Sequence, residues 1–217
     1  EEDRRNAGSQ ILKRIKKKQR KFAKSAHLEI GCFLKDDAAF AQLLAWKSAQ
    51  HHETHSTNVL SKRWIRNVIT DIYSLPQDDD FGGALFTLRA NGDLAAGLFC
   101  IRSNKTLHAW YVGHNHVYDA HSPGLILFAE AMKAASEAGY HEMDFGAGDY
   151  RFKQSFANCA RPVGPGYVGE VNLSSIWREM QFQVRDIAEH LPIGRAKNWP
   201  GKAMRKMDVY RGMHESH

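Results

Sequence analysis

Residues 106–158 read TLHAWYVGHNHVYDAHSPGLILFAEAMKAASEAGYHEMDFGAGDYRFKQSFAN, and the period of the apolar residues changes along this stretch. Residues 106–112 alternate and are rich in aromatic and β-branched side chains, which is typical of a strand. Over residues 125–132 the apolar side chains recur at spacings of three and four, which indicates a helix. Residues 140–145 return to strand character, and after a glycine-rich turn a second, shorter helix carries Lys153. The stretch therefore predicts a β-α-β unit followed by a short helix.

The helix in this unit has a defined start and end. Ser122 stands at the N-cap position, Pro123 takes the first helical position, and Gly124 lets another group approach the backbone closely. Gly139 ends the helix as a C′ glycine. A helix start carries free N–H groups and a partial positive charge, so at the carboxyl end of a strand it favours a phosphate or pyrophosphate. An ordinary α/β crossover begins with the same residues.

The segment before this unit predicts an antiparallel meander. Asn91-Gly92 separates two apolar runs and is a strong hairpin signal, because both residues tolerate a positive φ. A turn at residues 103–105 leads into the strand at Thr106. Residues 81–113 are therefore expected to form three antiparallel strands that continue into the β-α-β unit.

Further elements are predicted on both sides of the meander. Residues 28–34 read as a first strand. Two helices are expected next, one opened by Asp36 and Asp37 and running to Gln50, and one capped by Ser56 or Thr57 and running to about Tyr73. Residues 161–171 are expected to form a last strand, and residues 172–190 an amphipathic helix with Ile176, Met180, Val184 and Ile187 on one face.

Three segments together resemble a known family. They read LFTLRANGDLAAGLFCIRSNKTLHAWYVGHN, YDAHSPGLIL and MDFGAGDYRFKQSFAN, and they cover about residues 81–160. In these segments the chain resembles the acetyltransferase domain of the CelD-like proteins ("cellulose biosynthesis protein CelD"), which belong to the GNAT superfamily and are related to the FemAB aminoacyltransferases. Typical GNAT members carry an Arg/Gln-x-x-Gly-x-Gly/Ala loop where this chain has only Ser-Pro-Gly.

The resemblance implies a fold and a domain layout. The implied fold class is α/β (α+β), with a mixed, mostly antiparallel central sheet and flanking helices. Residues 1–26 are expected to form a basic N-terminal linker helix, residues 27–190 the acyltransferase domain, and residues 191–217 a tail or short helix. In the CelD-like proteins a similar basic helix joins an upstream domain. The chain begins EEDRRNAGSQ without methionine, so we expect it to be a fragment.

The resemblance also implies acyl transfer to an amine, with acetyl-CoA or a longer acyl-CoA as donor. The donor's pyrophosphate is expected at Ser122, Pro123 and Gly124. The attacking amine must be neutral, which requires a carboxylate or imidazole within reach. The candidate catalytic residues are Asp149, Lys153 and Asp144. The candidate acceptor contacts are Tyr118, Asp119, His116 and Tyr150, and His114 and His121 border the same loop.

No metal site is expected from the sequence. His51, His52 and His55 lie in the segment HHETH, but no Glu-x-x-His partner or cysteine pair completes a zinc site. The three cysteines form no CxxC motif, so we expect reduced thiols and a cytoplasmic protein. No apolar run approaches the roughly 20 residues of a membrane span.

The charge is +6, and much of the excess lies in one helix over residues 9–25, around a thin apolar line. This helix is expected to be a partly buried packing helix, or else to meet an anionic membrane surface, nucleic acid or an acidic substrate. Nucleic acid ranks last among these partners, because no aromatic residues are interleaved with the basic ones.

The predicted function is N-acylation of an amino sugar or another amine-bearing precursor in cell-envelope or exopolysaccharide biosynthesis. One alternative is a lipid-amide N-acyltransferase at the inner membrane surface, which would act on a long-chain amine. A second alternative is a non-catalytic binding module in a polysaccharide-synthesis assembly. A third is an enzyme that uses aminoacyl-tRNA in place of acyl-CoA.

Overall fold

A computed structural model describes residues 2–54, 58–77, 80–147, 151–163, 173–190 and 199–214. The chain divides into two compact units, Glu1–Arg161 and Pro162–His217. Each unit is described by itself.

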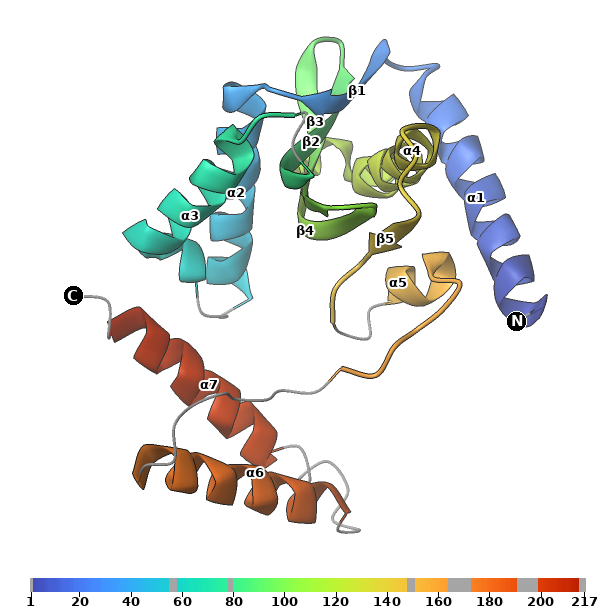
Figure 1. The fold of residues 1–217 in the computed structure, drawn as a ribbon. Coiled ribbons are helices and arrows are strands. Elements are labelled where there is room, and N and C mark those ends of the chain that lie inside the picture. Colours follow the sequence, from blue (N-terminus) through green and yellow to red (C-terminus); the bar gives the residue numbers. More distant parts are fainter. Residues whose placement is uncertain are drawn as a thin grey trace. The chain divides into compact units, whose positions relative to one another are not determined.

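The first unit is built on a five-stranded sheet with the order β1-β2-β3-β4-β5 (Figure 1). The first four strands are antiparallel neighbours, and β5 pairs parallel with β4. Helix α4 makes the crossover between these two parallel strands, as the sequence predicts. The strands are β1 (Leu28–Leu34), β2 (Phe81–Ala90), β3 (Asp93–Ser103), β4 (Thr106–His114) and β5 (Glu142–Asp144).

Helices cover both faces of the sheet (Figure 1). On one face, α2 and α3 pack on β2, β3 and β4, and on the other face lie α4 and α1. The predicted mixed, mostly antiparallel sheet with flanking helices is therefore confirmed. The helices of this unit are α1 (Glu2–Phe22), α2 (Asp37–Glu53), α3 (Arg63–Ser74), α4 (Pro123–Glu137) and α5 (Arg151–Phe156), with the 3₁₀ helices η1 (Val59–Ser61) and η2 (His116–His121).

The central strands are apolar on both sides because both sides are covered. Leu85 and Phe99 face the core beneath α2 and α3, whereas Phe86 and Leu98 face the core beneath α4 and α1. All four side chains are completely buried. Alternate side chains of a strand point to opposite faces, so each strand contributes to both cores.

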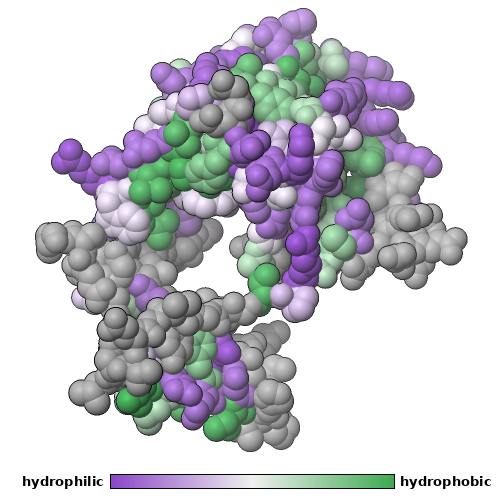
Figure 2. Space-filling model, in the orientation of Figure 1, coloured by the Kyte–Doolittle hydropathy of each residue, from purple (hydrophilic) through white to green (hydrophobic). Residues whose placement is uncertain are grey.

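Helix α1 belongs to this packing. Ile15 and Phe22, two apolar residues among its basic ones, are 3% and 1% exposed, in the core beneath α4. Gln19 Nε2 donates a hydrogen bond to Glu130 Oε1 of α4 at 3.0 Å. The partial burial expected for the basic helix is thus confirmed, and hydrophilic residues cover much of the coloured surface of this unit in Figure 2.

Turn and cap residues confirm several predictions. Asn91 and Gly92 adopt φ values of 53° and 89° in the β2–β3 hairpin. Asp36 Oδ1 accepts a hydrogen bond from the N–H of Ala39 at 2.9 Å and so caps α2. Gly139, with a φ of 80°, follows the C-cap residue of α4.

The expected start of the third helix is wrong. Helix α3 begins at Arg63, its N-cap residue is Lys62, and this residue makes no side-chain cap. The 3₁₀ helix η1 precedes it, and its Leu60 is 3% exposed in the core beneath α2. Because Leu60 is buried, residues 59–61 form a separate 3₁₀ turn before α3, whereas the sequence predicted one continuous helix from Ser56 or Thr57.

The second unit contains α6 (Leu173–His190) and α7 (Trp199–His214). Arg178 Nη2 of α6 donates to Asp208 Oδ2 of α7 at 2.6 Å. The predicted helix over residues 172–190 is confirmed, although its apolar face from Ile176 to Ile187 is largely exposed in the described residues. Most of the strand expected over residues 161–171 lies outside the described residues. No helix in the described part of the chain has the length and apolar character that a membrane span needs.

Candidate active site

Strands β4 and β5 separate soon after they meet. In the described part of the chain they pair only at Thr106↔Glu142, Leu107↔Met143 and His108↔Asp144. The rest of β4, up to His114, continues along β3 without β5 beside it. One edge of β4 is therefore without a strand partner beyond His108, within the described residues.

A β-bulge lies in this part of β4. The β3–β4 register passes from Phe99↔Tyr111 to Cys100↔Ala109, so Trp110 is the extra residue. Its side chain is 48% exposed. Bulges interrupt the hydrogen-bond ladder and redirect side chains, and they recur next to active sites.

The far end of β4 leads to the start of α4. A Cβ atom added to Gly124 would lie 3.8 Å from His114 Nδ1 and 3.8 Å from Val112 Cγ2, so the first turn of α4 lies against the end of β4. Both distances are ordinary van der Waals contacts, so the position does not require glycine, contrary to the close backbone approach expected at Gly124.

Ser122 occupies the N-cap position of α4 in an unexpected way. It adopts φ 54° and ψ 57°, and its side chain makes no capping hydrogen bond. Instead its Oγ accepts a hydrogen bond from Lys18 Nζ of α1 at 2.7 Å. The position was predicted correctly, but the first turn of α4 lacks a side-chain cap and has a lysine ammonium beside it. Both features favour an anion.

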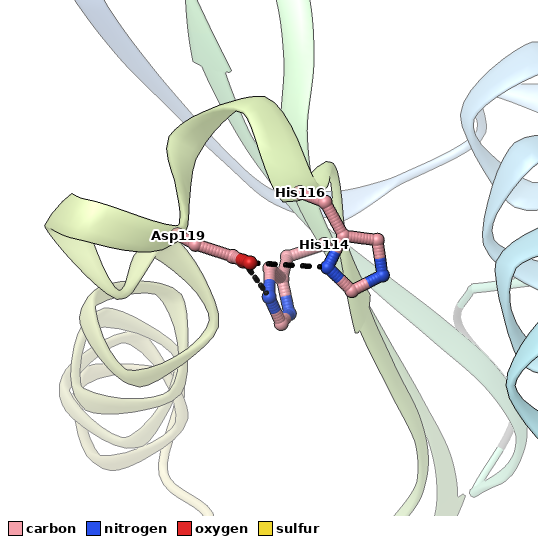
Figure 3. Close-up of side chains that lie close together, drawn as sticks. All are labelled: His114, His116 and Asp119. Atoms are coloured by element: carbon pink, nitrogen blue, oxygen red, sulfur yellow. Dashed lines mark hydrogen bonds and ion pairs between the residues drawn. The ribbon is translucent and has the colours of Figure 1, made fainter. Parts of the chain in front are cut away.

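The loop between β4 and α4 holds a cluster of three polar side chains, drawn in Figure 3. Asp119 Oδ1 lies 2.7 Å from His114 Nε2, and Asp119 Oδ2 lies 3.2 Å from His116 Nδ1. The hydrogen bonds from His116 and His114 lower the pKa of Asp119, so it is a carboxylate at neutral pH. Of the predicted acceptor contacts, the structure thus brings His116 and Asp119 together and adds His114.

Tyr118 and His121 of the same loop pack on α1. The His121 ring stacks on Phe22 with centroids 4.3 Å apart and an interplanar angle of 6°, and the Tyr118 ring lies 5.4 Å from Phe22. Tyr118, a predicted acceptor contact, is partly buried in this packing. Phe22 therefore positions the loop that carries the cluster.

A second pair lies where β4 and β5 separate. His108 Nδ1 of β4 is 3.2 Å from Asp144 Oδ2 of β5, and the side chains are 37% and 46% exposed. Burial alone would raise the pKa of Asp144, but the N–H of Gly146, 2.7 Å from Oδ1, and the His108 ring outweigh it, so the pKa is lowered. Asp144, a predicted catalytic residue, is thus an ionised carboxylate that orients an imidazole.

Lys153 lies near this pair. Its Nζ donates to the carbonyl oxygens of Gly146 and Ala147 at 3.2 and 2.8 Å, in the turn that follows β5. Burial lowers the pKa of Lys153, and the nearby Asp144 opposes this shift. Two other predicted site residues, Asp149 and Tyr150, lie outside the described residues.

Sequence reasoning missed His108 and Lys18. His108 becomes the partner of Asp144 through the parallel register of β4 and β5, and Lys18 reaches Ser122 from a helix more than a hundred residues away in the chain. Neither contact leaves a local pattern. The one signal that pointed to histidines near β4 was chemical: an acceptor amine must lose a proton, so a carboxylate or imidazole has to lie within reach.

A sequence profile described as "Acetyltransferase (GNAT) domain" matches residues 9–154. No curated protein shows significant similarity to the chain. Similar solved structures include an aminoglycoside acetyltransferase from an uncultured soil metagenomic sample in complex with trehalose, at 14% identity over 66% of this chain and 96% of that one, with a TM-score of 0.45. An acetyltransferase from Streptococcus agalactiae is 16% identical over 52% of this chain and 67% of that one, with a TM-score of 0.40. At these identities the likeness is to the fold alone.

Proposed function

Because the chain belongs to the acetyltransferase (GNAT) domain family, whose members acylate amines from acyl-CoA, we propose that its acceptor is a small-molecule or glycan amine. The separation of β4 from β5 at His108↔Asp144, with the start of α4 at the other end of β4, is the observation that carries this proposal. The resemblance to the CelD-like proteins supports an amino sugar, or another precursor of a cell-envelope polysaccharide, as the acceptor.

The donor's phosphates bind at the start of α4 in this proposal. Ser122, Pro123 and Gly124 present the first turn of the helix, and Lys18 adds a cation beside it. Pro123 has no N–H, and the N–H of Ser122 donates to the carbonyl oxygen of Asp119. The N–H of Gly124, the positive end of the helix dipole and the ammonium are therefore the groups that attract a pyrophosphate.

The acyl arm of the donor then follows β4. A strand rises about 3.3 Å per residue, so His114 and His108 lie about 20 Å apart along β4. The pantetheine arm is extended and carries amides, which can pair with the strand edge that β5 leaves without a partner. This path brings the thioester past the bulge at Trp110 towards His108 and Asp144.

His108 and Asp144 prepare the acceptor amine. The Asp144 carboxylate attracts the ammonium form, and the imidazole that it orients takes the proton. The neutral nitrogen attacks the thioester carbonyl, a C–N bond forms, the C–S bond breaks and CoA leaves as the thiolate, which takes the second proton lost by the nitrogen. Lys153 keeps the turn beside Asp144 ordered, and Asp149, which follows this turn, is a second proposed contact for the amine.

Donor binding can be tested by the melting temperature of the chain with acetyl-CoA, palmitoyl-CoA, free CoA or no ligand. Ligand at 100 times its Kd stabilises the native state by about 2.7 kcal/mol, which for a chain of this size raises the melting temperature by roughly 5–10 °C. A shift with acetyl-CoA and turnover with glucosamine support the proposal. A preference for palmitoyl-CoA and a long-chain amine would replace the sugar by a lipid acceptor.

Substitution at the proposed base tests the chemistry. His108→Gln and Asp144→Asn should each lower kcat/KM about 10²–10⁴-fold, the usual contribution of a general base. Lys153→Ala and Asp149→Asn should lower it as well. His141→Gln is the matched control, because His141 is an exposed histidine just before β5. Full activity in correctly folded His108→Gln and Asp144→Asn variants would remove these residues from the mechanism.

A further inference from the structure

The His114–His116–Asp119 cluster has a use that acyl transfer does not require. Its ligand atoms, one from each side chain, all lie within 4.8 Å of one another. We propose that these three residues bind a divalent transition-metal ion, with Zn²⁺ as the probe. The site lies at the opposite end of β4 from His108 and Asp144, so metal binding can be measured separately from the proposed chemistry.

The local fold brings the three ligands together within a short segment. His114 ends β4, and Asn115 then caps η2 by accepting a hydrogen bond from the N–H of Val117 at 3.1 Å. A 3₁₀ helix has three residues per turn, so His116 and Asp119 lie on the same side of η2. Figure 3 shows both facing His114, and the two imidazole rings have centroids 5.2 Å apart.

The donor set suits a transition metal. Two imidazole nitrogens and one carboxylate oxygen are common ligands of Zn²⁺, and three protein ligands leave positions for water. Bonds of roughly 2.0–2.2 Å require ligand atoms about 3.3 Å apart in a tetrahedron. Asp119 already lies 2.7 Å from His114 and 3.2 Å from His116. Because the three ligand atoms lie within 4.8 Å of one another, side-chain rotations can bring them to this spacing.

Exposure makes the site accessible. The side chains of His114, Asp119 and His116 are 37%, 56% and 75% exposed. An ion can enter without unfolding the loop, and it would replace the hydrogen bonds that now join the carboxylate to the two imidazoles. Phe22 contacts His121 and Tyr118, so the backbone of the loop that carries the ligands is already held against α1.

The test is isothermal titration calorimetry of the full chain with ZnCl₂, after treatment with a chelator and its removal. We expect binding of one ion that falls at least 10-fold in affinity in His116→Ala and in Asp119→Ala. His27→Ala is the matched control, because His27 also lies beside a carboxylate, 3.5 Å from Glu29, but no third ligand joins them among the residues that the structure describes. This variant should bind as the unchanged chain does.

Two results would overturn the proposal. One is the absence of Zn²⁺ binding by the unchanged chain. The other is equal binding in the His116→Ala and Asp119→Ala variants, which would direct the search to His51 and His52 on α2. Melting temperatures of the variants identify any loss of binding that comes from misfolding. Co²⁺ absorption spectra of His114→Ala then provide a second readout of metal binding. Neither result depends on whether the chain transfers acyl groups.

Discussion

Phe22 offers the sharpest test of how α1 and the active-site loop are joined. Its ring is 1% exposed, stacks on His121 and lies 5.4 Å from Tyr118. Phe22→Ala removes the ring from the core beneath α4 and also removes the surface on which η2 rests. We expect it to lower the stability of the first unit and to loosen residues 116–121.

The magnitude follows from burial. Replacing a fully buried phenylalanine by alanine costs about 3–5 kcal/mol, from the lost transfer free energy and the cavity left behind. With a urea m-value of about 2 kcal/mol/M, the midpoint of unfolding should fall by about 1.5–2.5 M. Phe81→Ala is the matched control, because Phe81 is 47% exposed at the start of β2, and it should cost less than about 1 kcal/mol.

The assay must report on the first unit alone, because the chain forms two units. Hydrogen exchange by mass spectrometry in increasing urea gives the free energy of unfolding for peptides of β3, in the centre of the sheet. Peptides over residues 116–121 report on η2 in the absence of urea. Equal losses in Phe22→Ala and Phe81→Ala, with unchanged exchange over η2, would refute the role given to Phe22.

Two further predictions concern Asp36. Asp36→Ala should destabilise the first unit by about 0.5–2 kcal/mol, because the Asp36 side chain caps α2 and pairs with Arg89 at 2.7 Å. Asp36→Asn keeps the cap, so it should lower the free energy of unfolding in urea by less than Asp36→Ala does. The N–H of Ala39 and then Arg89 lower the pKa of Asp36, so its contribution is complete above the unfolded pKa of about 3.9 and is lost as pH falls through the lower folded pKa. The unchanged chain should therefore lose more stability than Asp36→Asn between pH 6 and pH 2, and parallel pH profiles would contradict this.

Local patterns predicted most of the elements of the first unit. Alternating apolar residues and the Asn91-Gly92 turn fixed the β2–β3 hairpin, and Pro123 and Gly139 marked the two ends of α4. These signals depend on the backbone preferences of neighbouring residues, so they are legible in a single sequence. The start of α3 was missed because burial of Leu60, a tertiary effect, decided it.

The candidate site likewise combines features that local sequence predicted with contacts that the tertiary structure decided. The sequence by itself determined a helix start suited to phosphate and a loop rich in histidine and aspartate. Only the tertiary structure decided that His108 pairs with Asp144 and that Lys18 reaches Ser122. The first contact depends on the register of two parallel strands joined by a helix, and the second on the packing of α1 against the loop before α4. Both join residues distant in the chain, whose pairing is set by the burial of apolar surface rather than by local preference.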